Sequence, residues 1–139
     1  MKLKHSITIN SPLASVWSTT VDVNNWNKWT PTIETSSLND ESFSLGSSAT
    51  IKQPDMAESI WTITQFEDKE SFTWETSVPG LKMIASHRLV EVNPNETTNI
   101  LILEVKGLLS FILWPILKGK IRNSLEKENE GLKSFCEQR

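Results

Sequence analysis

Hydrophobic and polar residues alternate over the first ten positions of the chain. Leu3, Ile7 and Ile9 fall on one parity, whereas Lys4 and Thr8 fall on the other. A period of two is typical of a strand with one buried face. The pattern therefore predicts a strand over residues 2–10.

Two short helices are expected after this strand. The dipeptide Ser11–Pro12 combines a cap residue with a proline suited to the first helical position, and the helix should end near Asp22. Trp26 and Trp29 then stand three residues apart and are followed by Pro31. This spacing and the terminating proline predict a second short helix.

From residue 32 to residue 106 the pattern is one of strands divided by turn residues. The turns fall at Asn39–Ser42, Pro54–Asp55, Asp68–Glu70, Pro79–Gly80 and Asn93–Asn95. The predicted strands cover residues 32–38, 47–53, 58–67, 71–78, 81–92 and 97–106. Turns this short join antiparallel neighbours, so the strands are expected to form one antiparallel sheet.

The C-terminal segment, residues 107–139, changes to a helical period. Its apolar residues recur at three- and four-residue spacings: Phe111, Trp114, Leu117, Ile121, Leu125, Leu132 and Phe135. From Arg122 the opposite face is charged, which predicts one long amphipathic helix, and Pro115 is expected to kink it. Because residues 108–117 are apolar on all sides, we expect this part to be buried or to touch a partner.

These elements predict an α+β fold, in which a helix covers one face of an antiparallel sheet. We expect residues 1–139 to form a single domain, with about six to seven strands curving around the long helix and enclosing an apolar cavity. The hydrophobic content of 37% and the charged content of 22% lie in the globular range.

Composition excludes several partners and locations. A net charge of −3 gives no reason to expect nucleic acid, and a single cysteine, Cys136, favours a reducing compartment. The N-terminus lacks the apolar core of a signal peptide, and the apolar run 107–117 is shorter than the roughly 20 residues of a membrane span. We therefore expect a cytoplasmic monomer or weak homodimer without stable membrane insertion.

The common catalytic and metal-binding motifs are missing from the sequence. It contains no Cys-x-x-Cys, no His-Glu-x-x-His, no Gly-x-Ser-x-Gly, no phosphate-binding Gly-Lys-Ser/Thr and no dinucleotide glycine fingerprint. Two histidines and one cysteine make a zinc site implausible. The pattern argues against hydrolases, kinases and oxidoreductases, and we expect neither a metal nor a cofactor.

Several short motifs resemble the START-like superfamily, also called SRPBCC or helix-grip proteins, and in particular its polyketide cyclase/dehydrase-like branch. The motifs are Ser11–Trp17, Trp26–Pro31, Trp61–Ile63, Phe72–Trp74 with Pro79–Gly80, His87–Leu89 with Asn93–Thr97, and the helix entered through Gly107. Their order covers essentially the whole chain. The resemblance implies a cavity between sheet and helix that takes an apolar or amphipathic molecule; it leaves the function open, because this superfamily includes carriers, receptors, cyclases and co-chaperones.

His87 is the one candidate for acid/base chemistry. It shares parity with Met83, Ala85 and Leu89, so its imidazole should face the helix if that parity does. It would then act as a general acid/base or donate a hydrogen bond to a ligand. Because no carboxylate partner is evident from the spacing, a buried histidine with a structural hydrogen bond is the more ordinary interpretation. The other histidine, His5, is expected to be exposed.

The aromatic residues are the best candidates for a ligand wall. The chain has six Trp, five Phe and no Tyr, and alternation should place Trp61, Ile63, Phe72 and Trp74 on the concave face. The predicted ligand-binding residues are Trp29, Met56, Trp61, Trp74, Met83, His87, Phe111 and Trp114, with Trp29, Met56, Phe111 and Trp114 closing the two ends of the cavity. Ordinary core packing explains any one of these residues equally well.

Two further groups of polar residues have ordinary explanations. Glu128 and Asn129 lie close to the apolar stripe of the last helix, and we expect them where the sheet edge ends rather than in the cavity. Lys118, Lys120 and Arg122 follow the apolar run 108–117, a pattern that a membrane-seeking segment shares with a solvated face. The solvated face is the expectation.

Three functions remain open. The leading hypothesis is binding of a small hydrophobic or amphipathic molecule, such as a lipid, a polyketide or an aromatic compound. The second is a cofactor-free cyclase, dehydratase or isomerase in which His87 moves a proton and the cavity folds the substrate. The third is a protein- or membrane-interaction module that uses residues 108–117.

Overall fold

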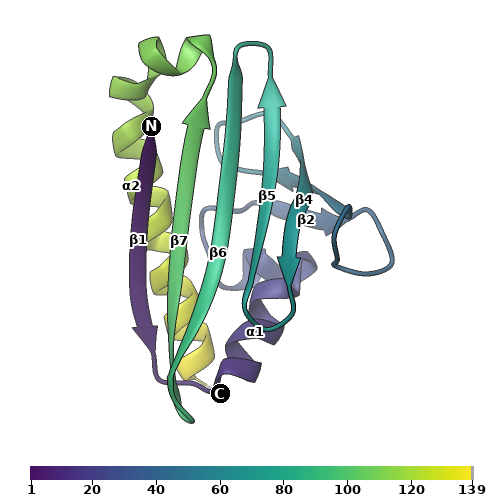
Figure 1. The fold of residues 1–139 in the computed structure, drawn as a ribbon, viewed down its shortest axis with the longest axis vertical. Coiled ribbons are helices and arrows are strands. Elements are labelled where there is room, and N and C mark those ends of the chain that lie inside the picture. The colour runs from purple at the N-terminus through teal and green to yellow at the C-terminus, as the bar shows by residue number, and fades with distance from the viewer. Residues whose placement is uncertain (139) are drawn as a thin grey trace.

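A computed structural model describes residues 1–138 and contains one antiparallel sheet of seven strands (Figure 1). The strands are β1 (Lys2–Ile9), β2 (Thr35–Leu38), β3 (Ser48–Lys52), β4 (Ser59–Glu67), β5 (Ser71–Val78), β6 (Leu81–Asn93) and β7 (Glu96–Lys106). Their order across the sheet is β1-β7-β6-β5-β4-β3-β2. Each strand from β2 onward pairs with its neighbour in the sequence, and β1 joins the last strand, with Lys2 opposite Glu104 and Ile9 opposite Thr97.

The helices are α1 (Leu13–Val21), the short 3-10 helix η1 (Val23–Lys28) and α2 (Leu108–Glu137). The expectation that Ser11 caps the first helix is wrong by one residue. Pro12, in an extended conformation, occupies the cap position, and its carbonyl accepts the N–H groups of Ser15 and Val16 at 3.0 and 3.1 Å. The Ser11 carbonyl instead accepts the Thr97 hydroxyl at 2.9 Å, which ties this corner to β7.

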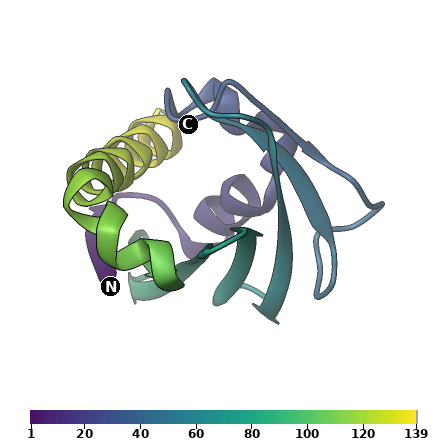
Figure 2. The ribbon, with the colours of Figure 1, turned by 90° about the horizontal axis from the view of Figure 1, so that it is seen from above.

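All three helices lie on the concave side of the sheet, as the view from above shows (Figure 2). Register shifts interrupt the pairing of β4 with β5 near Ile63 and of β6 with β7 near Glu91. Such bulges bend the strands and increase their twist. The sheet therefore curves around the helices, and α2 lies against β1 and β7.

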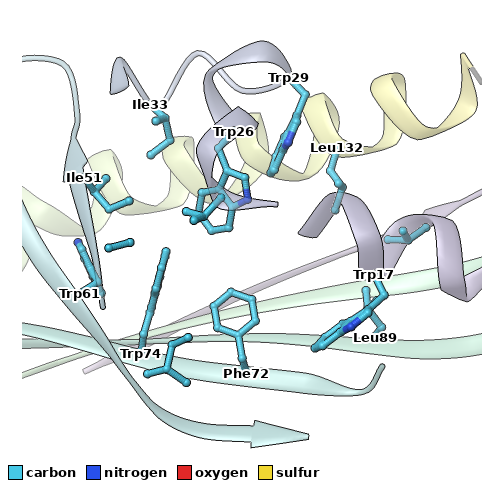
Figure 3. Close-up of a cluster of buried hydrophobic side chains, with 14 of the residues drawn as sticks. Trp17, Trp26, Trp29, Ile33, Ile51, Trp61, Phe72, Trp74, Leu89 and Leu132 are labelled. Carbon is cyan, nitrogen blue, oxygen red and sulfur yellow. The ribbon is translucent and has the colours of Figure 1, made fainter. Parts of the chain in front are cut away.

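The inward face of the sheet carries the residues that alternation predicted. Ile63, Phe72, Trp74 and Leu89 are all buried, and they pack with Trp26 of η1 in the main core cluster (Figure 3). Indole rings run across this cluster from η1 to β4, with centroids 5.2 Å apart for Trp26 and Trp74 and 5.8 Å apart for Trp74 and Trp61. The parity that contains His87 thus faces the helices, which is the condition under which its imidazole should face them.

The helix α2 differs from its prediction at its start. Its later part buries an apolar stripe through Ile121, Leu125 and Leu132, but residues 108–116 are mostly exposed. Of the two alternatives expected for this apolar run, burial on every side is wrong, because the sheet ends beside it and offers no second layer; contact with a partner is the alternative that is left. Figure 1 shows that these first turns bend away from the rest of the helix, and Pro115, inside the helix, removes a backbone hydrogen bond there.

A candidate ligand-binding cavity

A cavity of about 170 Å³ lies between the concave face of the sheet and α2. Most of its lining is apolar: Trp26, Ile33, Ile51, Met56, Trp61, Trp74, Met83, Ala85, Leu101, Ile102, Leu103, Leu117, Ile121 and Leu125. Met56, from the connection between β3 and β4, and Lys120, from α2, are exposed to solvent as well as lining it. The cavity therefore opens to solvent between this connection and the first half of α2.

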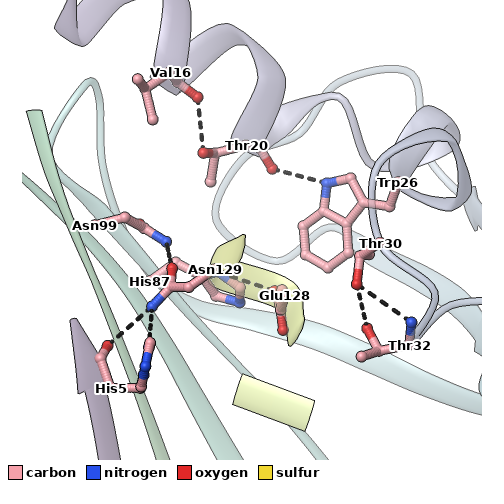
Figure 4. A network of polar contacts seen from close by, with 10 residues as sticks. All are labelled: His5, Val16, Thr20, Trp26, Thr30, Thr32, His87, Asn99, Glu128 and Asn129. Atoms are coloured by element: carbon pink, nitrogen blue, oxygen red, sulfur yellow. Dashed lines mark hydrogen bonds and ion pairs between the residues drawn. The ribbon is translucent and has the colours of Figure 1, made fainter. Parts of the chain in front are cut away.

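Two ionisable side chains face each other within this apolar lining. The Nδ1 atom of His87 on β6 lies 3.8 Å from Oε1 of Glu128 on α2 (Figure 4). This distance is longer than a hydrogen bond, so neither group satisfies the other. The pair is a polar point in a mostly apolar lining, to which Gln53, Ser86, Lys120 and Ser124 also contribute, and a bound molecule or a water can bridge it.

Burial shifts the pKa of both groups toward their neutral forms. Desolvation lowers the pKa of His87 from 6.5 to about 3. Desolvation raises the pKa of Glu128 from 4.5 to about 7. Near neutral pH the imidazole is therefore uncharged, and the carboxyl group changes its protonation state, because removal from water penalises the charged form of each.

Aromatic rings hold the His87 imidazole in place. The ring stacks on Phe72, with the ring centroids 4.4 Å apart and the planes 10° apart. It also packs against the ring of Trp26, with centroids 5.5 Å apart. Trp26 is itself fixed by its Nε1–H, which donates to the Thr20 carbonyl at 3.1 Å. The orientation of the imidazole is thus set by packing, and the nitrogen that faces Glu128 stays pointed at the cavity.

A second polar cluster lies beside the cavity and joins three elements. Asn99 of β7 donates to the Asn129 side-chain oxygen at 2.7 Å, and the Asn129 amide donates to Nδ1 of His5 at 2.8 Å and to its carbonyl at 3.2 Å (Figure 4). Asn129 is fully buried. The expectation that His5 is exposed is wrong, because its odd parity places it on the inner face of β1, where it is half-buried.

The structure brings together some of the predicted ligand-binding residues and not others. Met56, Trp61, Trp74, Met83 and His87 all line the cavity. Trp29, Phe111 and Trp114 do not line it. Trp29 packs against Trp26, with the ring centroids 5.7 Å apart. Trp114 is half-buried and packs against a second core cluster, formed by Leu101, Val105, Ile121 and Leu125. The side chain of Phe111 is 73% exposed.

Sequence reasoning missed Glu128 as a cavity residue. Glu128 and Asn129 were expected at the edge of the sheet, but both face inward, and Glu128 is the carboxylate partner of His87 that no spacing revealed. The sequence did contain a sign of their inward position, because they follow Leu125 by three and four residues and so share its apolar side of the helix. Trp26 was also omitted, although the spacing that predicted η1 had singled it out, and so were several aliphatic residues of the lining, such as Ile51 and Leu101.

Two absences hold for the described part of the chain. Residues 1–138 contain no group of three His, Cys, Asp or Glu side chains placed to hold a metal ion. Within the same residues, no helix has the length and apolar character to cross a membrane.

The sheet and the long helix that it curves around define a helix-grip fold. The chain belongs to the polyketide cyclase/dehydrase and lipid transport family, whose model matches residues 1–137. No curated protein matches the chain in a sequence comparison.

Solved structures share the fold at low sequence identity. A START superfamily protein from Mycobacterium smegmatis is 14% identical with a TM-score of 0.82, covering 99% of this chain and 97% of its own. An aromatase/cyclase from a Streptomyces species is 14% identical with a TM-score of 0.83, covering 100% of this chain and 94% of its own. A hypothetical protein from Helicobacter pylori is 9% identical with a TM-score of 0.84, and the match covers 98% of this chain and 88% of that protein. At these identities the likeness shows the fold.

Proposed function

We propose that the chain binds a small amphipathic molecule, mostly apolar and with one hydrogen-bonding group, in the cavity between the sheet and α2. The observation that carries this proposal is the position of the His87–Glu128 pair in a lining that is mostly apolar. The apolar part of the ligand would lie against Trp61, Trp74 and Leu125. Its polar group would lie between the imidazole and the carboxyl group.

The size of the cavity limits what can be enclosed. An engineered apolar cavity of about 150 Å³ is enough for benzene, whereas drug-sized ligands need about 300 Å³ or more. The enclosed volume of about 170 Å³ therefore fits one ring or a short chain. A longer molecule would extend through the opening beside Met56 and Lys120.

Apolar burial would supply most of the affinity. Removing about 200 Å² of apolar ligand surface from water contributes on the order of 5 kcal/mol. The polar pair would supply selectivity, because a protonated Glu128 donates a hydrogen bond and a neutral His87 offers either a donor or an acceptor. A ligand without any polar group would leave both unsatisfied, which costs binding free energy.

The proposal is tested by blocking the cavity. Ala85 faces inward between Trp74 and Leu103, and Ala85→Leu would fill part of the volume. Arg88→Leu on the same strand, at an exposed position, is the matched control. Binding of the neutral dye N-phenylnaphthylamine should weaken at least about tenfold in the first variant and stay unchanged in the second, with both folded by circular dichroism. Equal dye binding by all three proteins would refute the proposal.

A second function is supported by the contrast within the polar pair. A cyclase or dehydratase needs a group that exchanges protons near neutral pH, and Glu128, with a pKa of about 7, is better suited than His87, with a pKa of about 3. The acid/base role expected for His87 therefore passes to Glu128, with His87 positioning the substrate. Glu128→Gln should abolish conversion of a synthetic poly-β-keto thioester while dye binding is kept. Conversion that is unchanged in this variant would exclude the role.

A further inference from the structure

The first turns of α2 present a continuous apolar face to solvent. Leu108 is 83% exposed, Phe111 73%, Ile112 70% and Ile116 62%. These residues recur at three- and four-residue intervals, so they share one side of the helix. Single exposed apolar residues are ordinary, but a contiguous group of large ones marks a surface that binds something.

This apolar face is anchored to the end of the sheet. The Leu109 N–H donates to the Gly80 carbonyl at 2.9 Å, and the Leu109 side chain lies against Gly80 in the turn between β5 and β6. Gly107 precedes the helix with a φ of +106° and contacts the Gly80 carbonyl so closely that a Cβ atom would not fit. The helix start is therefore held in position while its apolar side points outward.

The charged residues that α2 carries next to this face are basic, whereas Lys106, just before the helix, is paired with Glu104 at 3.9 Å. Residues 105–125 contain Lys106, Lys118, Lys120 and Arg122 and no acidic residue, although the whole chain has a net charge of −3. Lys118 and Arg122 follow Phe111 at seven and eleven residues, so they continue its side of the helix. Apolar residues flanked by basic ones match a membrane surface, where acyl chains lie beneath anionic head groups.

We propose that the face formed by Leu108, Phe111, Ile112 and Ile116 docks reversibly on membranes that contain anionic lipid. The apolar side chains enter the boundary between head groups and acyl chains, and Lys118 and Arg122, which continue the same side of the helix, bind lipid phosphates. A second copy of the chain fits less well, because a symmetric contact would bring the same basic residues of both copies together.

Docking in this way would place the cavity beside the lipid surface. Leu117 and Lys120 line the cavity and follow directly after the exposed face. An amphipathic ligand would then pass between membrane and cavity over a short path. The docking proposal itself does not depend on which ligand the cavity takes.

Vesicle co-sedimentation of the full chain tests the proposal. The probes are vesicles of phosphatidylcholine alone and vesicles of phosphatidylcholine with about one third phosphatidylglycerol, an anionic lipid that supplies the charge the basic residues require. We expect binding to the mixed vesicles and at least about tenfold weaker binding to phosphatidylcholine alone. Raising the salt concentration should weaken the binding to the mixed vesicles.

Matched variants separate the apolar from the electrostatic contribution. Phe111→Ser combined with Ile112→Ser should lower the partition coefficient at least about tenfold. The control pair Leu45→Ser and Ile60→Ser, at positions 66% and 58% exposed but outside α2, should leave it unchanged. Lys118→Glu combined with Arg122→Glu should also lower it at least about tenfold, for anionic vesicles only.

Several results would overturn the proposal. One is failure of the unmodified chain to bind the mixed vesicles. Another is binding that the Phe111 and Ile112 substitutions do not reduce. A third is a stable dimer in analytical ultracentrifugation that these substitutions dissociate, because the occupant of the face would then be a second copy of the chain.

Discussion

The Nδ1 atom of His87 lies 3.8 Å from Oε1 of Glu128, and this pair connects the middle of the sheet to the long helix across the cavity. Burial makes the charged form of each group less favourable, so the pKa of His87 is lowered and the pKa of Glu128 is raised. The stability of the fold should therefore depend on pH through this pair.

Glu128→Gln should remove the part of this dependence that comes from the carboxyl group. Its pKa is raised from 4.5 to about 7, so between these values the folded state holds a proton that the unfolded state has lost. The free energy of unfolding of the unmodified chain consequently falls as pH rises through this window. The variant should gain stability relative to it, by up to about 3 kcal/mol above pH 7.

Urea denaturation of both proteins between pH 4 and pH 8 measures this difference. The effect of His87 has the opposite sign, because its lowered pKa makes the folded state bind fewer protons and stability rises with pH from about 3 to 6.5. His87 is present in both proteins, so its effect cancels in the comparison. A difference that does not vary with pH would show that Glu128 is not desolvated.

Two glycines of α2 should respond to the same substitution with opposite signs. A Cβ atom at Gly131 would meet the Trp29 carbonyl oxygen, so Gly131→Ala should lower the free energy of unfolding by about 1 to 3 kcal/mol. Gly119 has no atom within 4 Å of its Cβ position, and Gly119→Ala should raise it by up to about 1 kcal/mol through helix propensity. Thermal and urea denaturation compare the two; stabilisation by both would mean that α2 does not approach Trp29 this closely.

Asn129→Ala should destabilise the contact between α2 and β1. The substitution leaves the buried Asn99 amide and Nδ1 of the half-buried His5 without their partner, at a cost of about 1 to 3 kcal/mol. Asn123→Ala, at an exposed position of the same helix, is the control and should change the free energy of unfolding by less than about 0.5 kcal/mol. Equal effects of the two substitutions in urea denaturation would contradict the buried network.

Trp26→Phe should cost more than its loss of ring size suggests. The Trp26 Nε1–H is the partner of the buried Thr20 carbonyl, and losing it should cost about 1 to 3 kcal/mol beyond the packing loss. Trp114→Phe, at a half-buried position, is the comparison, with an expected loss of about 1 kcal/mol or less. Similar losses for both would argue that the Thr20 carbonyl is satisfied in another way.

Much of the fold follows from local sequence patterns. Alternation and turn residues predicted the strands, alternation placed Phe72 and Trp74 on the inward face, and the helical period predicted α2. Such patterns are reliable because they depend only on which side of an element is apolar. The cap at Ser11 was misplaced because one residue decides it, and Pro12 fits the cap position too.

The site is less predictable because it depends on how a helix is rotated against a sheet. Adjacent residues of an α-helix point in directions about 100° apart, so the rotation of α2 about its own axis decides whether Glu128 or its neighbour faces His87. The exposure of Phe111 has a similar origin, since the sequence shows that residues 108–117 are apolar but not that the sheet ends before covering them. The position of Trp29 behind Trp26 likewise depends on the path of η1.

The pairing of β1 with β7 has a consequence for how the molecule is made. Among the seven strands of this sheet β1 is synthesised before the other six, and its neighbour in the sheet is β7, at residues 96–106. It cannot pair there until β7 has also been made, and a pairing between such distant segments forms slowly. A ribosome that stalls before β7 would therefore leave β1 without its partner strand.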